Sequence, residues 1–577
     1  MDNRAQMPSP SATPHPSDPA HGRLLVVVAG LTVFVLVWAS STQIFDTNFQ
    51  TLFEATALLN GDHPYRDFFE WGVPLQALVS AVAQVLFGNR LIGEFLVQWL
   101  FIVSGVVISF HLSLRLAHSV WASLFTMLLA LPLLAVTPTY TYPKLFFYPL
   151  AVWLLWRYVE RPSARRSVAL GFTTAVAFLF RHDHGVYIGV ASALAFILLR
   201  FVAPSSRSMR SLVKESAAYL ATSAAILAPW LIVVHLHEGL PEYIQLRADL
   251  FEDWSGKGFI YQSLFSVSPI EALGPTAEVA FAWLFQVVLL IPILLLMVAA
   301  LDLLHSWWRA EPVAVDTYRL VVAAILLVVV ETQTFKQQSY SLHVIPLTAA
   351  MSTRLLAARR GDRSTAPRIR RARFGLLWLL TRGAVTFGML FVTTVATVTF
   401  THDRGAFDVE LLRAVRPTFQ RLLASPPIDG YMSAHAALEV DKTAWEREGA
   451  DRIGVILRYV RECTRPGDRI LVTGSTPYHV GYYTGRSIAG GHLFWHFGWR
   501  SDPAGEARSL TMLQSQSVPF ALSTTEPILE DFVRYPTIRE HLVNNYIELD
   551  GSEGYFLVDK RRQPTGRFGA LGFPCFG

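Results

Sequence analysis

Long apolar runs alternate with short polar connections over the first 400 residues of this chain. Many runs approach the ~20 residues that a helix needs to cross the hydrocarbon core of a bilayer. They predict about eleven membrane-spanning helices, near residues 24–40, 92–113, 119–136, 145–160, 167–180, 186–201, 217–236, 279–301, 319–331, 343–356 and 383–400. The run at 73–87 is shorter and contains two Gln, which favours an interfacial or core helix over a crossing one.

The pattern changes after residue 401, where charges become frequent and short β-rich runs alternate with helical periodicity. Strands are predicted at 468–474, 520–523 and 555–558, and helices at 447–462, 505–516 and 534–547. We therefore expect an α-helical polytopic membrane protein with a C-terminal α/β domain. Its predicted divisions are a disordered tail (1–23), a membrane domain (24–401) with a large first loop (41–91) holding helices near 49–60 and 73–87, and the α/β domain (402–577).

Composition supports the membrane class, and the basic residues predict the orientation. Hydrophobic residues make up 52% of the chain and charged residues only 16%, against about 25% charge in soluble domains. With the N-terminus in the cytoplasm, 21 Lys and Arg fall in the inner connections and 7 in the outer ones, as the positive-inside rule requires. The loop 41–91 and the C-terminal domain then face outward. The net charge of +5 reflects this topology, so we expect membrane lipid and no nucleic acid as a partner.

Both cysteines of the chain, Cys463 and Cys575, fall in the predicted outer domain. An outside compartment permits a disulfide between them. Two unpaired buried cysteines are the alternative, because the sequence does not give the Cα separation that bonding requires.

The first loop carries acids and aromatic residues close to the membrane boundary. Asp46 lies about one helical turn beyond the end of the first apolar run, near Ser40. A carboxylate there is placed to serve as a general base. It is equally a favoured residue type for capping a helix that starts near Phe49.

Farther along the loop, Gly61 is followed by Tyr65-Arg66-Asp67-Phe68 and Pro74. Together with the early Asp46, this resembles the pattern of GT-C glycosyltransferases, a group that includes bacterial aminoarabinose transferases and protein O-mannosyltransferases. A short basic turn at Arg115 and a segment with Lys336 and His343 add to the resemblance. The resemblance implies an inverting glycosyltransferase of the bacterial inner membrane. Its donor would be a polyprenyl-phosphate sugar and its acceptor a hydroxyl of a lipid, glycan or protein on the outer face.

In this interpretation Asp46 is the base, Tyr65 and Asp67 shape the donor pocket, and outward-facing polar residues bind the phosphate. The phosphate-binding candidates are Arg66, Lys144, Arg181, Lys336 and His343, and Asp183, next to Arg181, is a further candidate for substrate binding. Three structural alternatives stay open: a solvated loop with an internal Arg–Asp pair at 181–185, an ion pair between Lys336 and Glu331, and a capping or packing role for His343. Thr47 stands where many members have Glu, and residues 137–144 contain no Asp-x-Asp, so a divalent cation is possible but disfavoured, and metal-free action is slightly preferred.

The outer loop 237–278 is acidic and contains Trp254, which fits either a solvated amphipathic helix or part of an acceptor pocket. Two other function classes stay open. A non-catalytic receptor or assembly protein would use the outer domain for binding. A transporter would need polar or broken segments at mid-membrane, whereas the ionisable residues here gather at the predicted outer surface.

Overall fold

A computed structural model provides the structure of the chain. It describes residues 19–42, 46–69, 72–136, 142–202, 208–256, 291–304, 306–308, 313–332, 344–356, 380, 383, 409–434, 450–474, 477–492, 495 and 500–577. These residues are mostly helical, and strands occur among them only beyond residue 470.

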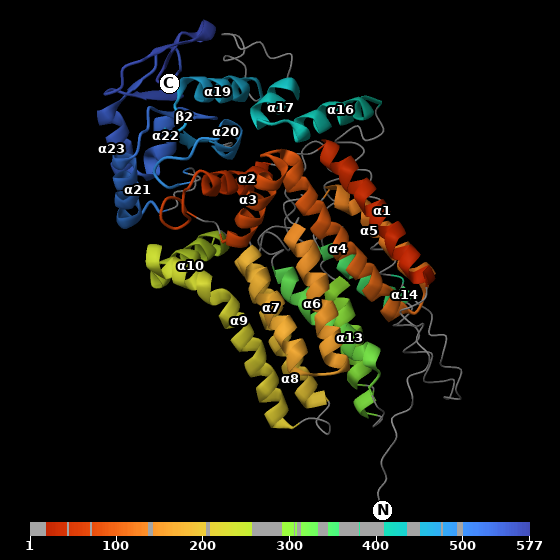
Figure 1. Cartoon of the computed structure of the whole chain (residues 1–577). Helices are drawn as coiled ribbons and strands as arrows, with labels where there is room; N and C mark the ends of the chain where they lie inside the picture. The colour runs from red at the N-terminus through yellow and green to blue at the C-terminus, as the bar shows by residue number, and fades with distance from the viewer. Residues whose placement is uncertain are drawn as a thin grey trace, which may run out of the picture.

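Long helices form a bundle in which neighbouring segments run roughly side by side (Figure 1). The bundle contains α1 (Pro19–Thr42), α4 (Leu91–Ala117), α5 (Val120–Val136), α6 (Tyr142–Glu160), α7 (Ala164–Phe180), α8 (His182–Val202), α9 (Met209–His237), Ile291–Trp308, α13 (Val315–Glu331) and α14 (Ile345–Leu356). Each overlaps a predicted span, and the last predicted span, 383–400, falls almost wholly outside the described residues. By length and hydropathy, three of these described helices are suited to crossing a bilayer: α4, α9 and Ile291–Trp308. The total of eleven spans stays a prediction.

Small residues let the bundle helices approach closely. A Cβ on Gly105 of α4 would overlap the backbone carbonyl of Leu145 in α6. A Cβ on Gly171 of α7 would stand 2.5 Å from the carbonyl oxygen of Tyr219 in α9. Helices in a bilayer gain stability mainly from such close packing, because lipid is as apolar as their side chains. These contacts fix α6 and α7, whose ends carry several candidate site residues.

Two short helices of the first loop, α2 (Asp46–Leu59) and α3 (Pro74–Phe87), pack against each other at one end of the bundle. α3 turns its polar side inward: Gln84 donates to the carbonyl of Leu52 at 3.0 Å, and Ser80 is 1% exposed. Its apolar side is open, with Val85 and Leu86 exposed by 66% and 72%. A helix that buries polar groups and exposes apolar ones is suited to contact with lipid, which agrees with the interfacial alternative predicted for 73–87.

The C-terminal part, meaning the described residues from 409 onward, contains a four-stranded sheet in the order β1-β2-β4-β3, with β1 and β2 parallel. Its strands are β1 (Leu471–Thr473), β2 (Phe520–Ser523), β3 (Tyr546–Glu548) and β4 (Phe556–Asp559), and β5 (Gly566–Phe568) pairs separately with β6 (Phe573–Cys575). Its helices are α16 (Val409–Leu423), α17 (Pro427–Ala434), α19 (Ala450–Cys463), α20 (Pro477–Thr484), α21 (Pro503–Ser515), α22 (Ile528–Asp531) and α23 (Pro536–Asn545).

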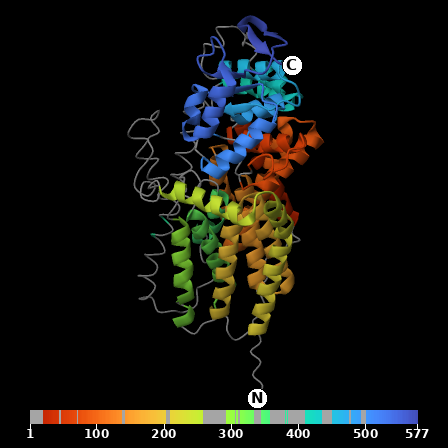
Figure 2. The same cartoon turned by 90° about the vertical axis from the view of Figure 1, so that its left-hand side faces the viewer.

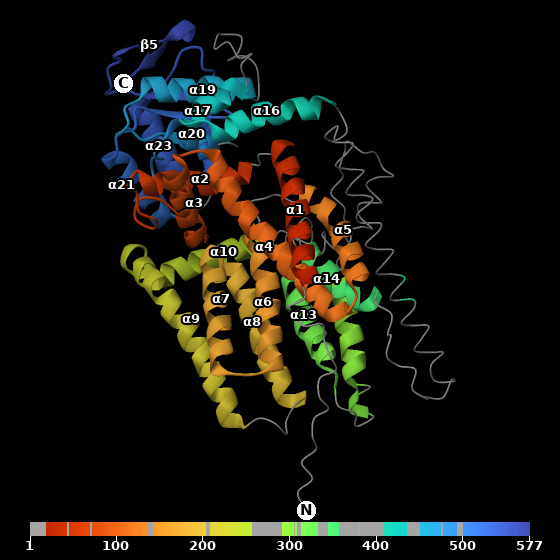
Figure 3. The same ribbon diagram turned by 45° about the vertical axis from the view of Figure 1, so that its right-hand side comes forward.

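The three predicted strands and three predicted helices of the C-terminal part are present. The helix predicted at 534–547 ends at Asn545, because the chain turns there into β3, which pairs with β4. Cys463 and Cys575 form a disulfide that joins α19 to β6. The C-terminal part lies over α2 and α3 at one end of the bundle, as Figures 2 and 3 also show.

Candidate functional site

The candidate site lies where the first loop meets the ends of the bundle helices. The predicted helix start near Phe49 is wrong by three residues, because α2 begins at Asp46. Asp46 therefore stands in the first turn of α2 and does not precede a helix that starts at Phe49. Its backbone is described but its side chain is not, so its role as a base stays a prediction.

The Tyr65-Arg66-Asp67 turn ties the loop to α9 and α10 (Leu240–Gly256). Tyr65 is 3% exposed, and its hydroxyl accepts a hydrogen bond of 2.7 Å from Trp230 Nε1. Asp67 accepts hydrogen bonds from Arg66 and from the backbone N–H of His63. Burial alone would raise the pKa of Asp67, but these hydrogen bonds and the charge of Arg66 hold it below its usual value. Arg66 is 51% exposed, so its pair with Asp67 orders the turn at the surface.

The C-terminal part also contacts the first loop near this turn. Asp62 forms an ion pair with Arg469, and Asn60 donates to the carbonyl of Gly485 at 3.1 Å. The backbone carbonyl of Tyr65 accepts from Arg508. These contacts join segments that lie more than 400 residues apart in the sequence.

A second group of polar residues gathers at the adjoining ends of α6, α7 and α8. Lys144 lies in the first turn of α6 and is 1% exposed, within electrostatic range of Arg181 and Asp183. Arg181 Nη2 lies 2.9 Å from Asp183 Oδ2. His184 Nδ1 lies 3.1 Å from Asp183 Oδ1 and 3.0 Å from the hydroxyl of Tyr148. Ionisable groups buried among apolar helices, as Lys144 and His184 are here, are costly and usually functional.

The predicted connection at 181–185 is nearly all helical. α7 ends at Phe180 and α8 begins at His182, so only Arg181 adopts an extended conformation between them. The Arg181–Asp183 pair of the structural alternative is present, but both side chains are less than one-third exposed. A freely solvated loop at this position is therefore wrong.

His182 links this polar group to the first loop. Its backbone N–H donates to the carbonyl of Gly72 at 3.2 Å, and its ring is hydrogen-bonded to Tyr243. The rings of Phe178 and Trp230 pack against it with centroid separations of 4.4 and 5.0 Å. The loop turn at Tyr65 and the Lys144 group thus belong to one continuous set of contacts.

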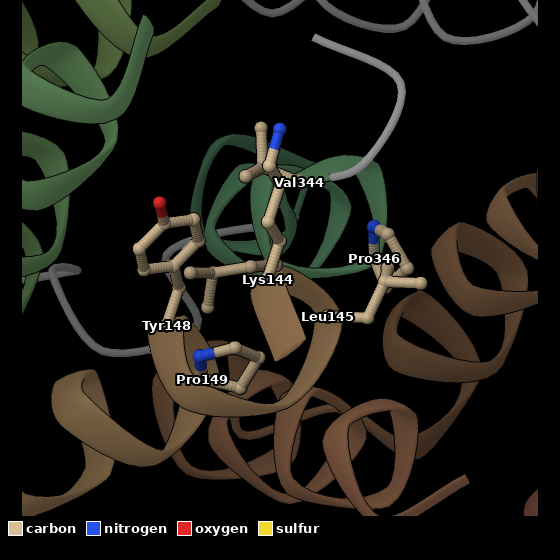
Figure 4. A pocket seen from close by; sticks show the side chains of 7 residues that line it. Lys144, Leu145, Tyr148, Pro149, Val344 and Pro346 are labelled. Carbon is tan, nitrogen blue, oxygen red and sulfur yellow. The ribbon is translucent and has the colours of Figure 1, made fainter. Parts of the chain in front are cut away.

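Lys144 lines a small, closely packed pocket between α6 and the start of α14 (Figure 4). Lys144 and Tyr148 supply its polar atoms, and the remaining lining is apolar: Leu145, Pro149, Val344, Pro346 and Leu347.

The structure brings Lys144, Arg181 and Asp183 together, whereas Arg66 and Asp67 pair with each other at the surface. Lys336 and His343 lie outside the described residues. Among the described residues, no group of three or more His, Cys, Asp or Glu gathers as a metal site.

Sequence reasoning missed Tyr148, Trp230 and Tyr243. Of these, Tyr148 alone carried a signal, since it stands one helical turn after Lys144. Within the predicted loop 237–278, the structure shows a helix, α10 (Leu240–Gly256), as the helical alternative expects, and residues 257–278 lie outside the described residues.

No protein-family model matches this chain, and a search of curated proteins finds no match. Among solved structures, it is similar to the oligosaccharyltransferase of Archaeoglobus fulgidus in the apo form, with 12% identity and a TM-score of 0.41 over 87% of this chain and 69% of that one. The same enzyme in complex with Zn and sulfate gives a TM-score of 0.42 over 87% and 67%. Such scores do not establish a shared fold, so the proposal below is supported by the chain's own residues.

Proposed function

We propose that this chain is an inverting glycosyltransferase that takes a sugar from a polyprenyl-phosphate carrier at the outer face of the bacterial inner membrane. The observation that carries the proposal is Lys144, a lysine that is 1% exposed, lies within electrostatic range of Arg181 and lines a small, mostly apolar pocket. A phosphate on an isoprenoid chain has the matching chemistry, because its head is anionic and its chain apolar.

In the proposed reaction, Asp46 takes the proton of the acceptor hydroxyl as the oxygen attacks the anomeric carbon. The bond between that carbon and the phosphate oxygen breaks, and its electron pair leaves with the polyprenyl phosphate. One displacement inverts the anomeric configuration. A carboxylate base typically contributes 10²–10⁴-fold to such a step.

Lys144 and Arg181 stabilise the negative charge that grows on the leaving phosphate. Asp183 orients Arg181 through their ion pair and limits its freedom to swing away. Tyr65 and Asp67 hold the turn of the loop in place, which fixes the far end of α2. Lys336 and His343 would add further cationic or hydrogen-bonding groups for the phosphate.

The direct test is incubation of purified protein in lipid nanodiscs with a panel of polyprenyl-phosphate sugars and labelled hydroxyl acceptors, with and without chelator. We expect transfer from at least one donor, with the anomeric configuration of the product opposite to that of the donor. Transfer from none of the donors would overturn the proposal in favour of a non-catalytic membrane protein.

A further inference from the structure

The N-terminal half of α2 rests on α20, a helix of the C-terminal part. The ring of Phe49 lies 3.9 Å from that of His479 and 5.3 Å from that of Tyr483, measured between centroids. Phe49 and Phe53 are both fully buried. The helix that begins with Asp46 is therefore seated on a surface supplied from more than 400 residues away.

The two helices approach closely at Gly481. A Cβ at this position would overlap two ring atoms of Phe53 and would lie 3.2 Å from a third. Phe53 cannot turn aside, because its ring packs in a buried cluster with Ala57, Phe68 and Ile488. Gly481 thus allows α2 to lie deeper against α20 than any other residue would permit.

Described residues of the loop beyond α2 are also held by the C-terminal part. Asp62 and Asn60, just past the end of α2, are held by Arg469 and the carbonyl of Gly485. Phe69 N–H donates to the carbonyl of Gly491 at 2.9 Å. A change in how α20 meets α2 must therefore be absorbed at the N-terminal end of α2, where Asp46 lies.

We infer that the C-terminal part is the positioning element of the proposed base, and that Gly481 is a positioning residue for Asp46. This inference rests on the proposed function. It assigns the C-terminal part a role in setting the geometry of the reaction.

Gly481→Ala isolates this role. Ala is the better helix former by about 1 kcal/mol, so the substitution should not weaken α20 itself. Relieving the overlap requires α2 to move on the order of 1 Å, since carbon atoms pack at about 3.5–4.0 Å. A misplacement of that size can cost on the order of 100-fold in rate. We expect kcat to fall about 100-fold while KM for the donor stays within about threefold, because Lys144 and Arg181 stand on other helices.

The experiment compares Gly481→Ala, Phe53→Leu and the double variant, with Gly467→Ala as control. Gly467 lies in the same part of the chain and has open space around its Cβ position. Two quantities are measured: steady-state kinetics, and hydrogen–deuterium exchange of the α2 amides. We expect Gly481→Ala to lower kcat and to speed exchange in α2, Phe53→Leu to restore both in the double variant, and Gly467→Ala to change neither.

Wild-type exchange in α2 of Gly481→Ala would overturn the inference, and so would a loss of kcat that Phe53→Leu does not repair. The exchange measurement needs no substrate. If the wild-type protein transfers no sugar, the proposed function fails while the exchange data still decide whether α20 positions α2.

Discussion

Replacing Lys144 with Met should weaken use of the donor and leave the fold intact. Met has similar length and fills the same space, so the wall of the pocket is kept while the charge is removed. Arg181 lies near Lys144, and their mutual repulsion is relieved by the change. Asp183 retains Arg181 at 2.9 Å. Removing one member of a buried charge pair destabilises a fold when it leaves the other charge without a partner. Asp183 keeps Arg181 as its partner in Lys144→Met, so we expect no large loss of folding stability.

The size of the effect follows from the bond that is lost. Hydrogen bonds to charged groups contribute about 1.5–3 kcal/mol, which corresponds to about 10- to 150-fold in an equilibrium or rate ratio. Lys144 is 1% exposed, so water replaces it poorly and the effect should lie toward the upper end of that range. The loss should be seen in kcat/KM for the donor.

The assay is transfer of labelled sugar at varied donor concentration, with a thermal unfolding curve for each variant. Lys214→Met is the matched control, because Lys214 is an exposed cation near the start of α9. It should leave kcat/KM unchanged. A Lys144→Met enzyme within twofold of wild type in kcat/KM would refute the assignment of the phosphate site.

Three further predictions concern the C-terminal part and the topology. Replacing Cys463 and Cys575 with Ser should lower the free energy of unfolding of the C-terminal part by about 2–5 kcal/mol in urea. The disulfide joins residues that are 112 positions apart and so restricts the unfolded chain. An unchanged free energy of unfolding would contradict this. Burial and the nearby Arg508 lower the pKa of His492 to about 3. As pH falls, the His492 imidazole is therefore protonated first in the unfolded state, so its contribution to folding stability is present above about pH 6.5 and is lost toward pH 3, by about 1.4 kcal/mol per pH unit. His492→Gln should reduce this dependence of the unfolding free energy on pH. An unchanged dependence in acid unfolding would argue against the assignment. In intact cells an impermeant maleimide should label Lys560→Cys but not Lys214→Cys, and the reverse pattern would invert the proposed topology.

The helices could be predicted from sequence because their signal is local. Apolar runs of sufficient length placed α4 and α9 to within a few residues, except that α9 begins at Met209, well before the predicted 217. That start is amphipathic and carries Glu215, which bonds to Tyr158 at 2.6 Å, so its helical state depends on a neighbour. The strand β3 was missed for the same reason, since its pairing partner β4 decides the end of α23.

The candidate site was predictable in its residue types but not in its grouping. The positions of Lys144 and Arg181 beside apolar runs marked them as costly charges. Their proximity depends on how α6 and α8 pack, which no local pattern encodes. The ion pair between Arg66 and Asp67 could not be predicted either. The two neighbouring side chains meet because the backbone turns at Tyr65, where φ is 69°. The contact of Gly481 with Phe53 joins two segments that carry no shared motif.

The central claim is that Asp46 is the base of a sugar transfer at the outer face of the membrane. Asp46→Asn keeps the size and the helix-starting character of the residue but cannot accept the proton. Its rate of transfer is measured with the donor that the wild-type protein uses, and its fold by thermal unfolding. The account predicts a normal unfolding curve and a kcat lower by about 10²–10⁴-fold. A correctly folded Asp46→Asn protein that transfers sugar at the wild-type rate would contradict it.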